Sequence, residues 1–223
     1  MRTLVAGSGH PEPATSRALG RVDFLMRPDA VWPMDVDRLA AGAGVVGPLV
    51  GFAATLSATV LSPSFRWTAS ALSDLGAPGA ANPWLFNWGL VASAAVTVVF
   101  VWVLWTDAAN RIEQLGAVLF VGANASLALV GLFPSGTDLH FPVAVAYFVL
   151  LTFTLWIHGS GWVLGGAPAS GLIAIWLGIG HVLLWIGWVA AGLGGIAIPE
   201  FGGSLALYAW IVLAVRTAGI PLR

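Results

Sequence analysis

Four long stretches of this chain contain no Asp, Glu, Lys or Arg, and they constrain the fold more than any other feature. A helix needs about 20 consecutive apolar residues to cross roughly 30 Å of hydrocarbon, and each stretch is longer than that. With 58% hydrophobic and 9% charged residues, the chain lacks the polar surface of a soluble domain. The sequence therefore predicts an all-α, polytopic membrane helix bundle. The uncharged stretches are residues 39–65, 75–106, 114–137 and 139–199.

Six membrane-spanning helices fit the chain, and charges, prolines and tryptophans mark their ends. They make up a predicted transmembrane domain over residues 39–223. The sixth span is the shortest apolar run and needs the apolar stem of Arg216 to complete it. The predicted spans are Ala40–Leu61, Trp84–Trp105, Leu115–Phe133, Pro142–Val163, Gly171–Leu193 and Glu200–Ala218.

The arginines predict how the bundle is oriented, because positive charge is enriched in cytoplasmic segments next to the spans. Only Arg66 falls in the loops that follow the first, third and fifth spans. We therefore expect both termini to be cytoplasmic and those three loops to lie outside the cell membrane. The other eight arginines belong to the opposite set of segments: Arg2, Arg17, Arg21, Arg27, Arg38, Arg111, Arg216 and Arg223.

Residues 1–38 precede the first span and mix Pro, Gly, Arg and Asp without a continuous apolar run. A secretory signal peptide would need an apolar core of about 7 to 15 residues. The composition favours a disordered cytoplasmic tail. A second interpretation is that translation begins at Met34.

Composition also excludes several chemistries. Without cysteine, the chain can form no disulfide, thiolate metal site or thiol nucleophile. A net charge of -1 provides no basic surface for nucleic acid, so membrane lipids are the expected partners and the sequence identifies no protein partner.

We expect no cofactor. His158 and His181 are poor axial ligands for one haem, because counting about 1.5 Å per residue places them at depths that differ by roughly 10 Å.

Polar and small residues inside the spans indicate how the helices pack. Asn87, Asn124 and His181 are polar groups within the membrane, which are costly unless partnered and are therefore candidate site residues. The competing interpretation, which we favour, is that each binds a neighbouring helix and makes packing specific. Gly47 and Gly51 have the spacing that allows close helix approach, as do Ser170, Ala174 and Gly178.

Most remaining polar groups fall in the three loops predicted to lie outside. Because three short loops on one side of a bundle must lie within reach of one another, we expect these side chains to converge. The first loop carries Arg66, Ser70, Ser73 and Asp74, the second carries Ser135, Asp138 and His140, and the third leads into Glu200.

Part of the first loop has the pattern of a short interfacial helix. Thr68 is the predicted N-cap, and the helix covers residues 69–75. Asp74 then falls on the last turn, where a negative charge opposes the helix dipole. A counter-charge such as Arg66 or His140 is expected beside it.

Four motifs at the span edges resemble an uncharacterised prokaryotic family of six-span membrane proteins, catalogued as domain of unknown function 998. The likeness runs from about Asp35 to the C-terminus and implies a six-helix bundle without implying an activity. The motifs are SDLG at Ser73–Gly76, FN at Phe86 and Asn87, FP followed by His at Phe133, Pro134 and His140, and IPE at Ile198–Glu200.

Several functions remain open for the cluster at the predicted outer face. Ser73, Asp74 and His140 are candidate catalytic residues of a lipid-directed hydrolase or transferase, since a Ser with a His base oriented by an acid performs acyl transfer. Asp138, His140 and Glu200 could instead hold a divalent metal, although no diagnostic metal spacing assigns one.

A structural role is the leading alternative for the same cluster. In that interpretation Arg66, Asp74, His140 and Glu200 form a network that ties the loops together, in a membrane protein whose biochemical role is unassigned. A third possibility is that the protein binds or carries an apolar ligand, because no Asp, Glu or Arg lies in mid-membrane to couple transport to ions.

Overall fold

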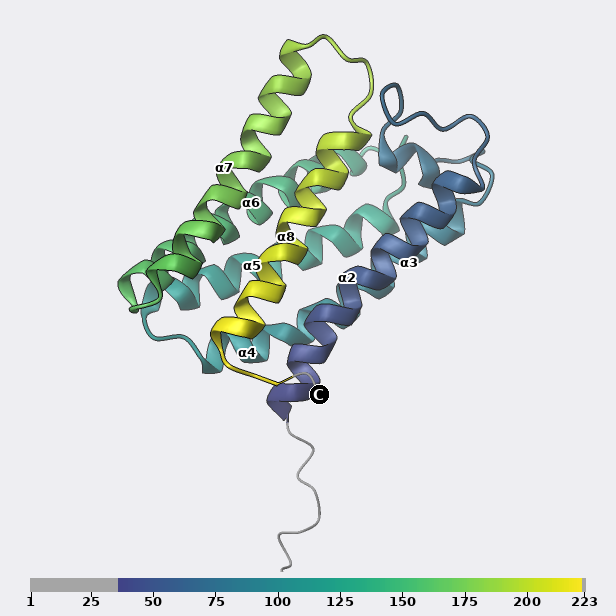
Figure 1. Cartoon of the computed structure of the whole chain (residues 1–223). Coiled ribbons are helices and arrows are strands. Elements are labelled where there is room, and N and C mark those ends of the chain that lie inside the picture. Colours follow the sequence, from purple (N-terminus) through teal and green to yellow (C-terminus); the bar gives the residue numbers. More distant parts are fainter. Residues whose placement is uncertain (1–35, 222–223) are drawn as a thin grey trace, which may run out of the picture. The chain divides into compact units, whose positions relative to one another are not determined.

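All six predicted spans are helices in the computed structural model, which describes residues 36–221 (Figure 1). The second span is interrupted by a 3₁₀ turn, and the described residues contain no strand. The membrane helix bundle is thus confirmed. The observed helix bounds differ most from the predicted ones at the first residues of two spans. The first span begins at Val36 instead of Ala40, and the third begins at Arg111 instead of Leu115. The spans are α2 (Val36–Val60), α3 (Pro83–Thr97) with η3 (Val98–Phe100) and α4 (Val101–Thr106), α5 (Arg111–Leu132), α6 (His140–Leu164), α7 (Pro168–Ala190) and α8 (Ala197–Thr217). The predicted N-terminal tail lies almost entirely outside the described residues.

Short loops make successive spans antiparallel, so the loops alternate between two ends of the bundle (Figure 1). One end carries the loops after α2, α5 and α7 and the buried Glu200, and is called here the Glu200 end. The other carries the loops after α4 and α6 and the buried Glu113, and is called the Glu113 end.

The early start of α5 follows from a side-chain cap that the apolar pattern does not reveal. Asn110 accepts hydrogen bonds through Oδ1 from the backbone N–H groups of Ile112 and Glu113, both at 3.0 Å. Glu113 in turn accepts from the Ala109 N–H at 3.0 Å and from the Asn110 amide at 2.9 Å. That amide also donates to the Gly161 carbonyl at 2.9 Å, which joins the start of α5 to the end of α6. The otherwise unpaired amides of the first turn are therefore satisfied.

Small residues bring α2 against the second span, as their spacing predicts. A Cβ added to Gly44 would lie 2.6 Å from Cγ of Phe100, and one added to Gly51 would lie 2.7 Å from Oγ of Ser93. A Cβ added to Gly47 would collide with Thr97. These glycines are thus required by the close approach of two backbones.

Helix α7 approaches α6 most closely through its first half. Ala174 is fully buried, and a Cβ added to Gly159 of α6 would lie 2.9 Å from the Ala174 methyl group. Gly178 lies against Trp156. One side of α6 stays uncovered, because Phe141 and Val149 are exposed.

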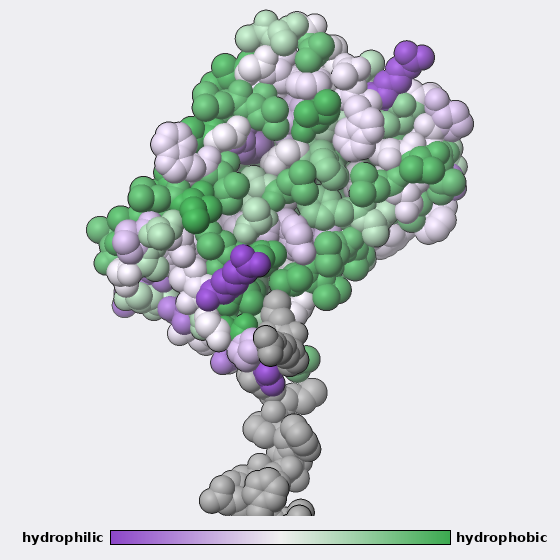
Figure 2. Space-filling model, viewed as in Figure 1, coloured by the Kyte–Doolittle hydropathy of each residue, from purple (hydrophilic) through white to green (hydrophobic). Residues whose placement is uncertain are grey.

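The core lies between the second span, α5, α6 and α8, and its largest fully buried side chain is Trp210 of α8. Phe120 bridges Trp210 and Phe100, with ring centroids 5.6 and 6.1 Å away. Outside this core, apolar residues cover most of the visible flank, and strongly hydrophilic residues are few (Figure 2). Such an apolar exterior suits contact with lipid chains.

The close packing of α2 makes Gly47 intolerant of a side chain. We expect Gly47→Leu to lower the free energy of unfolding by about 1–3 kcal/mol, because the added atoms overpack the contact with Thr97. Thermal unfolding of the purified protein in detergent measures the change. Gly180→Leu is the matched control, since no atom lies within 4 Å of a Cβ added there. Equal melting temperatures for the two variants would contradict the packing argument.

Candidate functional site

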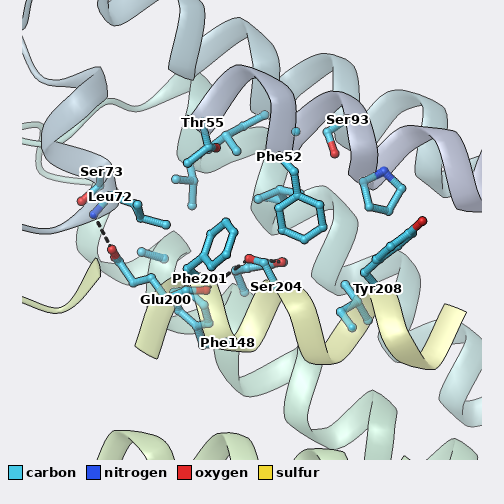
Figure 3. Close-up of a pocket in the computed structure, with 18 of the residues that line it drawn as sticks. Phe52, Thr55, Leu72, Ser73, Ser93, Phe148, Glu200, Phe201, Ser204 and Tyr208 are labelled. Atoms are coloured by element: carbon cyan, nitrogen blue, oxygen red, sulfur yellow. Dashed lines mark hydrogen bonds between the residues drawn. The ribbon is translucent and has the colours of Figure 1, made fainter. Parts of the chain in front are cut away.

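Glu200, in the first turn of α8, is the buried acidic group at its end of the bundle, with 7% of its surface exposed. Its Oε2 accepts a hydrogen bond of 2.6 Å from the backbone N–H of Leu72 (Figure 3). Leu72 begins η2 (Leu72–Gly76), a 3₁₀ helix in the loop between α2 and α3. Close by, the Ala197 N–H donates to the Ser70 carbonyl at 3.0 Å. The first and last of the three loops at this end therefore converge, as predicted.

The short helix of the first loop differs from its prediction. It begins at Leu72 with Ala71 as N-cap, so Thr68 is not the capping residue. Asp74 consequently lies in the first turn, where its Oδ2 accepts from the Ala71 N–H at 2.8 Å and where a negative charge suits the helix dipole. The reason to expect a counter-charge beside Asp74 is thus absent, and within residues 36–221 no ion pair joins Asp74 to Arg66 or His140. Arg66 is exposed, and its backbone N–H donates to the Ser70 hydroxyl.

A groove of about 600 Å³ runs along α6 and α7 from the Glu200 end into the membrane-spanning region. Its outer wall includes Phe141, which is 74% exposed, and the exposed Ile186, so the groove opens on the flank of the bundle. Between His140 and Trp156 it follows about 24 Å of helix at about 1.5 Å per residue. The groove is lined by Ser73, His140, Phe141, Ala144, Val145, Phe148, Val149, Thr152, Phe153, Trp156, His181, Val182, Trp185, Ile186, Ile196 and Glu200.

Three of the predicted site residues, Ser73, His140 and Glu200, meet at one end of this groove. Nδ1 of His140 lies 2.8 Å from the Phe133 carbonyl. Because a carbonyl only accepts, Nδ1 carries the proton, and a ring with this single proton has Nε2 free to accept. Asp74 does not line the groove, since its carboxylate is turned toward its own helix.

His181, predicted to lie near mid-membrane, forms part of the groove wall and is fully hydrogen-bonded. Its Nε2 accepts from the indole N–H of Trp185 at 2.8 Å. Nδ1 therefore carries the proton and donates to the Thr152 hydroxyl at 3.0 Å, which itself donates to the Phe148 carbonyl. This chain of bonds agrees with the packing interpretation of His181 and occupies both ring nitrogens.

An inner cavity of about 80 Å³ lies on the other side of Glu200, between α2, α3, α5, α6 and α8 (Figure 3). Ser73 and Glu200 line both this cavity and the groove. Asn124 also lines it and donates to the Phe120 carbonyl of its own helix at 2.9 Å. The buried Thr97 hydroxyl has no partner among the described residues. The cavity is mostly apolar, and Ser73, Thr97, Asn124 and Glu200 are among the polar residues that line it.

Phe52, Phe201 and Tyr208 separate the inner cavity from the flank between α2 and α8 (Figure 3). The ring centroid of Phe52 lies 5.4 Å from that of Phe201 and 5.8 Å from that of Tyr208, and both pairs have edge-to-face geometry. All three side chains are half-buried.

Asn87 lies outside both cavities and holds η2 against α3. Its amide donates to the Gly76 carbonyl at 3.0 Å. A Cβ on Gly76 would collide with this side chain, which explains the glycine of the SDLG motif by close approach. The Asn87 Oδ1 is buried without a partner among the described residues.

Asp138, one of the possible metal ligands, is exposed and does not line the groove that His140 and Glu200 share. Within residues 36–221, no three His, Cys, Asp or Glu side chains gather closely enough to hold a metal ion. In the same range, no hydrogen bond or ion pair links Arg66, Asp74, His140 and Glu200 to one another.

Buried polar residues also lie at the Glu113 end, where neither Asp107 nor Glu113 was predicted as a site residue. Glu113 and His158 are both buried and border a void of about 10 Å³ together with Asp107. The His158 ring lies edge-on to Trp162 and Trp210. Partial burial, and then the nearby Asp37 carboxylate, raise the pKa of Asp107. An Asn followed three residues later by Glu is a capping pattern that could have revealed Glu113.

The Glu200 hydrogen bond is expected to stabilise the protein measurably. Glu200→Ala leaves the buried Leu72 N–H without an acceptor, so we expect a loss of about 1–3 kcal/mol in the free energy of unfolding. Glu200→Gln retains a carbonyl oxygen and should lose less. Asp138→Asn, at an exposed position of the same end, is the control. Thermal unfolding in detergent separates these cases, and an unchanged midpoint for Glu200→Ala would show that the bond is dispensable.

Comparison with known proteins supports the family resemblance of the sequence motifs. A family model described as "Protein of unknown function (DUF998)" matches residues 45–217, a range that contains η2, the groove and Glu200. No curated protein and no solved structure matches the chain. With most of its length matched and with six helices able to span a membrane, the chain belongs to the DUF998 family and is a multi-pass membrane protein.

Proposed function

We propose that this protein binds a single-chain membrane amphiphile in the groove between α6 and α7. The observation that carries the proposal is an apolar groove of about 600 Å³ with Ser73, His140 and Glu200 at one end. The Thr152 hydroxyl and the His181 ring, which line the groove further along, are bonded to each other. Ligand sites are commonly 300–1,000 Å³, mostly apolar and provided with a few polar groups that orient the ligand. The groove has this character.

Its position favours a ligand that comes from the membrane. The exposed side chains of Phe141, Val149 and Ile186 border the groove on membrane-spanning helices, where lipid chains surround the protein. The groove follows about 24 Å of α6, whereas half of a hydrocarbon layer of roughly 30 Å is about 15 Å. An acyl chain can therefore lie along the groove with its polar group at the Glu200 end.

Orientation in the cell membrane is part of the proposal. Arg38, Arg111 and Arg216 lie at the Glu113 end, and Arg66 lies at the other. The enrichment of positive charge in cytoplasmic segments supports cytoplasmic termini and an outward-facing Glu200 end. The amphiphile would then enter from the outer leaflet.

A lipid-directed hydrolase or transferase is the second candidate, because Ser73 and His140 line one groove. The Phe133 carbonyl, through Nδ1, orients His140 in the manner that an acid does in a catalytic triad. Asp74 is not needed for that role. If the protein is a hydrolase or transferase, the wild type should release fatty acid from a bound ester and Ser73→Ala should not. If the protein only binds the amphiphile, neither the wild type nor Ser73→Ala should release fatty acid.

Filling the groove should prevent binding. We expect Val149→Trp to reduce labelling of α6 and α7 by a single-chain lipid that carries a photoreactive diazirine in its chain, as mapped by peptide mass spectrometry. Val149 lines the groove, whereas Val118 of α5 is similarly exposed and lines neither cavity. Val118→Trp is therefore the control and should label as the wild type does. Labelling spread evenly over all lipid-facing helices of the wild type would refute the proposal.

A further inference from the structure

We infer that the Glu200 end of the groove selects amphiphiles whose polar group donates hydrogen bonds, namely a hydroxyl or an amine, over those that carry a carboxylate or a phosphate. This inference rests on the proposed function, since it specifies the polar group of the same ligand. It follows from the hydrogen-bonding capacity that remains at Ser73, His140 and Glu200.

Glu200 has acceptor capacity that the protein does not use. Its Oε2 accepts from the Leu72 N–H at 2.6 Å, and Oε1 has no hydrogen-bonding partner in the described part of the chain. A carboxylate offers about four lone-pair sites. Glu200 borders the groove and its Oε1 retains accessible surface, so a donor placed in the groove can bond to these free sites.

His140 adds a second acceptor at the same end. Its Nδ1–H is committed to the Phe133 carbonyl at 2.8 Å, and Nε2 makes no hydrogen bond within residues 36–221. The Ser73 hydroxyl also makes none in that range and can both donate and accept. Two acceptors and one hydroxyl together match a group with two or more donors, such as a glycerol diol or an ammonium.

The same end is poorly equipped to bind an anion. None of the residues that line the groove or the inner cavity is Lys or Arg. Arg66 is exposed and lies outside both linings. The start of α8 does not compensate, because its Ala197 amide is bonded to the Ser70 carbonyl and its first turn contains Glu200. Carboxylate and phosphate groups are usually bound by Arg or Lys, and here they would face the Glu200 carboxylate.

Competition among four compounds with the same sixteen-carbon chain tests the inference. Each one competes with the photoreactive single-chain lipid for labelling of α6 and α7 in the full-length protein. We expect monopalmitoylglycerol and hexadecylamine to displace the probe at concentrations about tenfold lower than palmitate and hexadecyl phosphate, because hydrogen bonds to a charged group are worth at least this factor.

A matched pair of variants identifies the origin of the preference. Glu200→Gln replaces one acceptor by a donor and should reduce the tenfold preference to about threefold or less. Asp138→Asn removes an acidic group from the same end without touching the groove, and should leave the preference unchanged. If Glu200→Gln does not fold, the competition among the four compounds on the wild-type protein still tests the inference.

The possible results separate this inference from the proposed function. If all four compounds displace the probe equally, or if the anionic ones do so better, the groove binds chains but the selection by hydrogen-bond donors is wrong. An unchanged preference in Glu200→Gln would likewise overturn it. If none of the four compounds displaces the probe and labelling is spread over all lipid-facing helices, the groove is not a binding site. Both the proposed function and the selection by hydrogen-bond donors are then wrong.

Discussion

The hydrogen bond between the Leu72 N–H and the Glu200 carboxylate lies where the groove and the inner cavity meet, and the candidate site is arranged around it. It joins the first loop to the start of α8 across 128 residues, and so places Ser73 beside Glu200 at the boundary of the groove and the inner cavity. A buried carboxylate with a 2.6 Å bond to a backbone N–H is a strong, directional link. Together with the bonds from the Ala197 N–H to the Ser70 carbonyl and from the Asn87 amide to the Gly76 carbonyl, it fixes η2 beside the first turn of α8.

The two ends of the bundle use buried glutamates in different ways. Glu113 is fully engaged, with one oxygen bonded to the Ala109 N–H and the other to the Asn110 amide, and it closes the start of α5. Glu200 is bonded through one oxygen only and borders open space. A glutamate bonded through both oxygens serves the structure, whereas one with an unbonded oxygen beside a cavity is suited to a ligand. This difference is the physical basis of the proposals made for the Glu200 end.

Helix α7 explains why the groove exists. Its closest approach to α6 is at Ala174 and Gly178, and beyond that point it contacts α6 through the larger side chains of His181 and Trp185. In water an apolar groove would be covered by further protein, but in a membrane lipid chains solvate it at no cost. The hydrogen-bonded His181, Thr152 and Trp185 keep this part of the wall rigid while the groove stays open.

The sequence by itself determined the six spans, because only uncharged helices of about 20 residues can satisfy their backbone within hydrocarbon. It also placed the close contact at Gly47 and Gly51 and the convergence of the loops. Tertiary structure alone decided which polar residues share a site. The start of η2 at Leu72 turns Asp74 toward its own backbone and Ser73 toward the cavities, and the incomplete cover of α6 by α7 creates the groove. These outcomes depend on helix phase and on contacts between distant segments, which periodicity and charge do not encode.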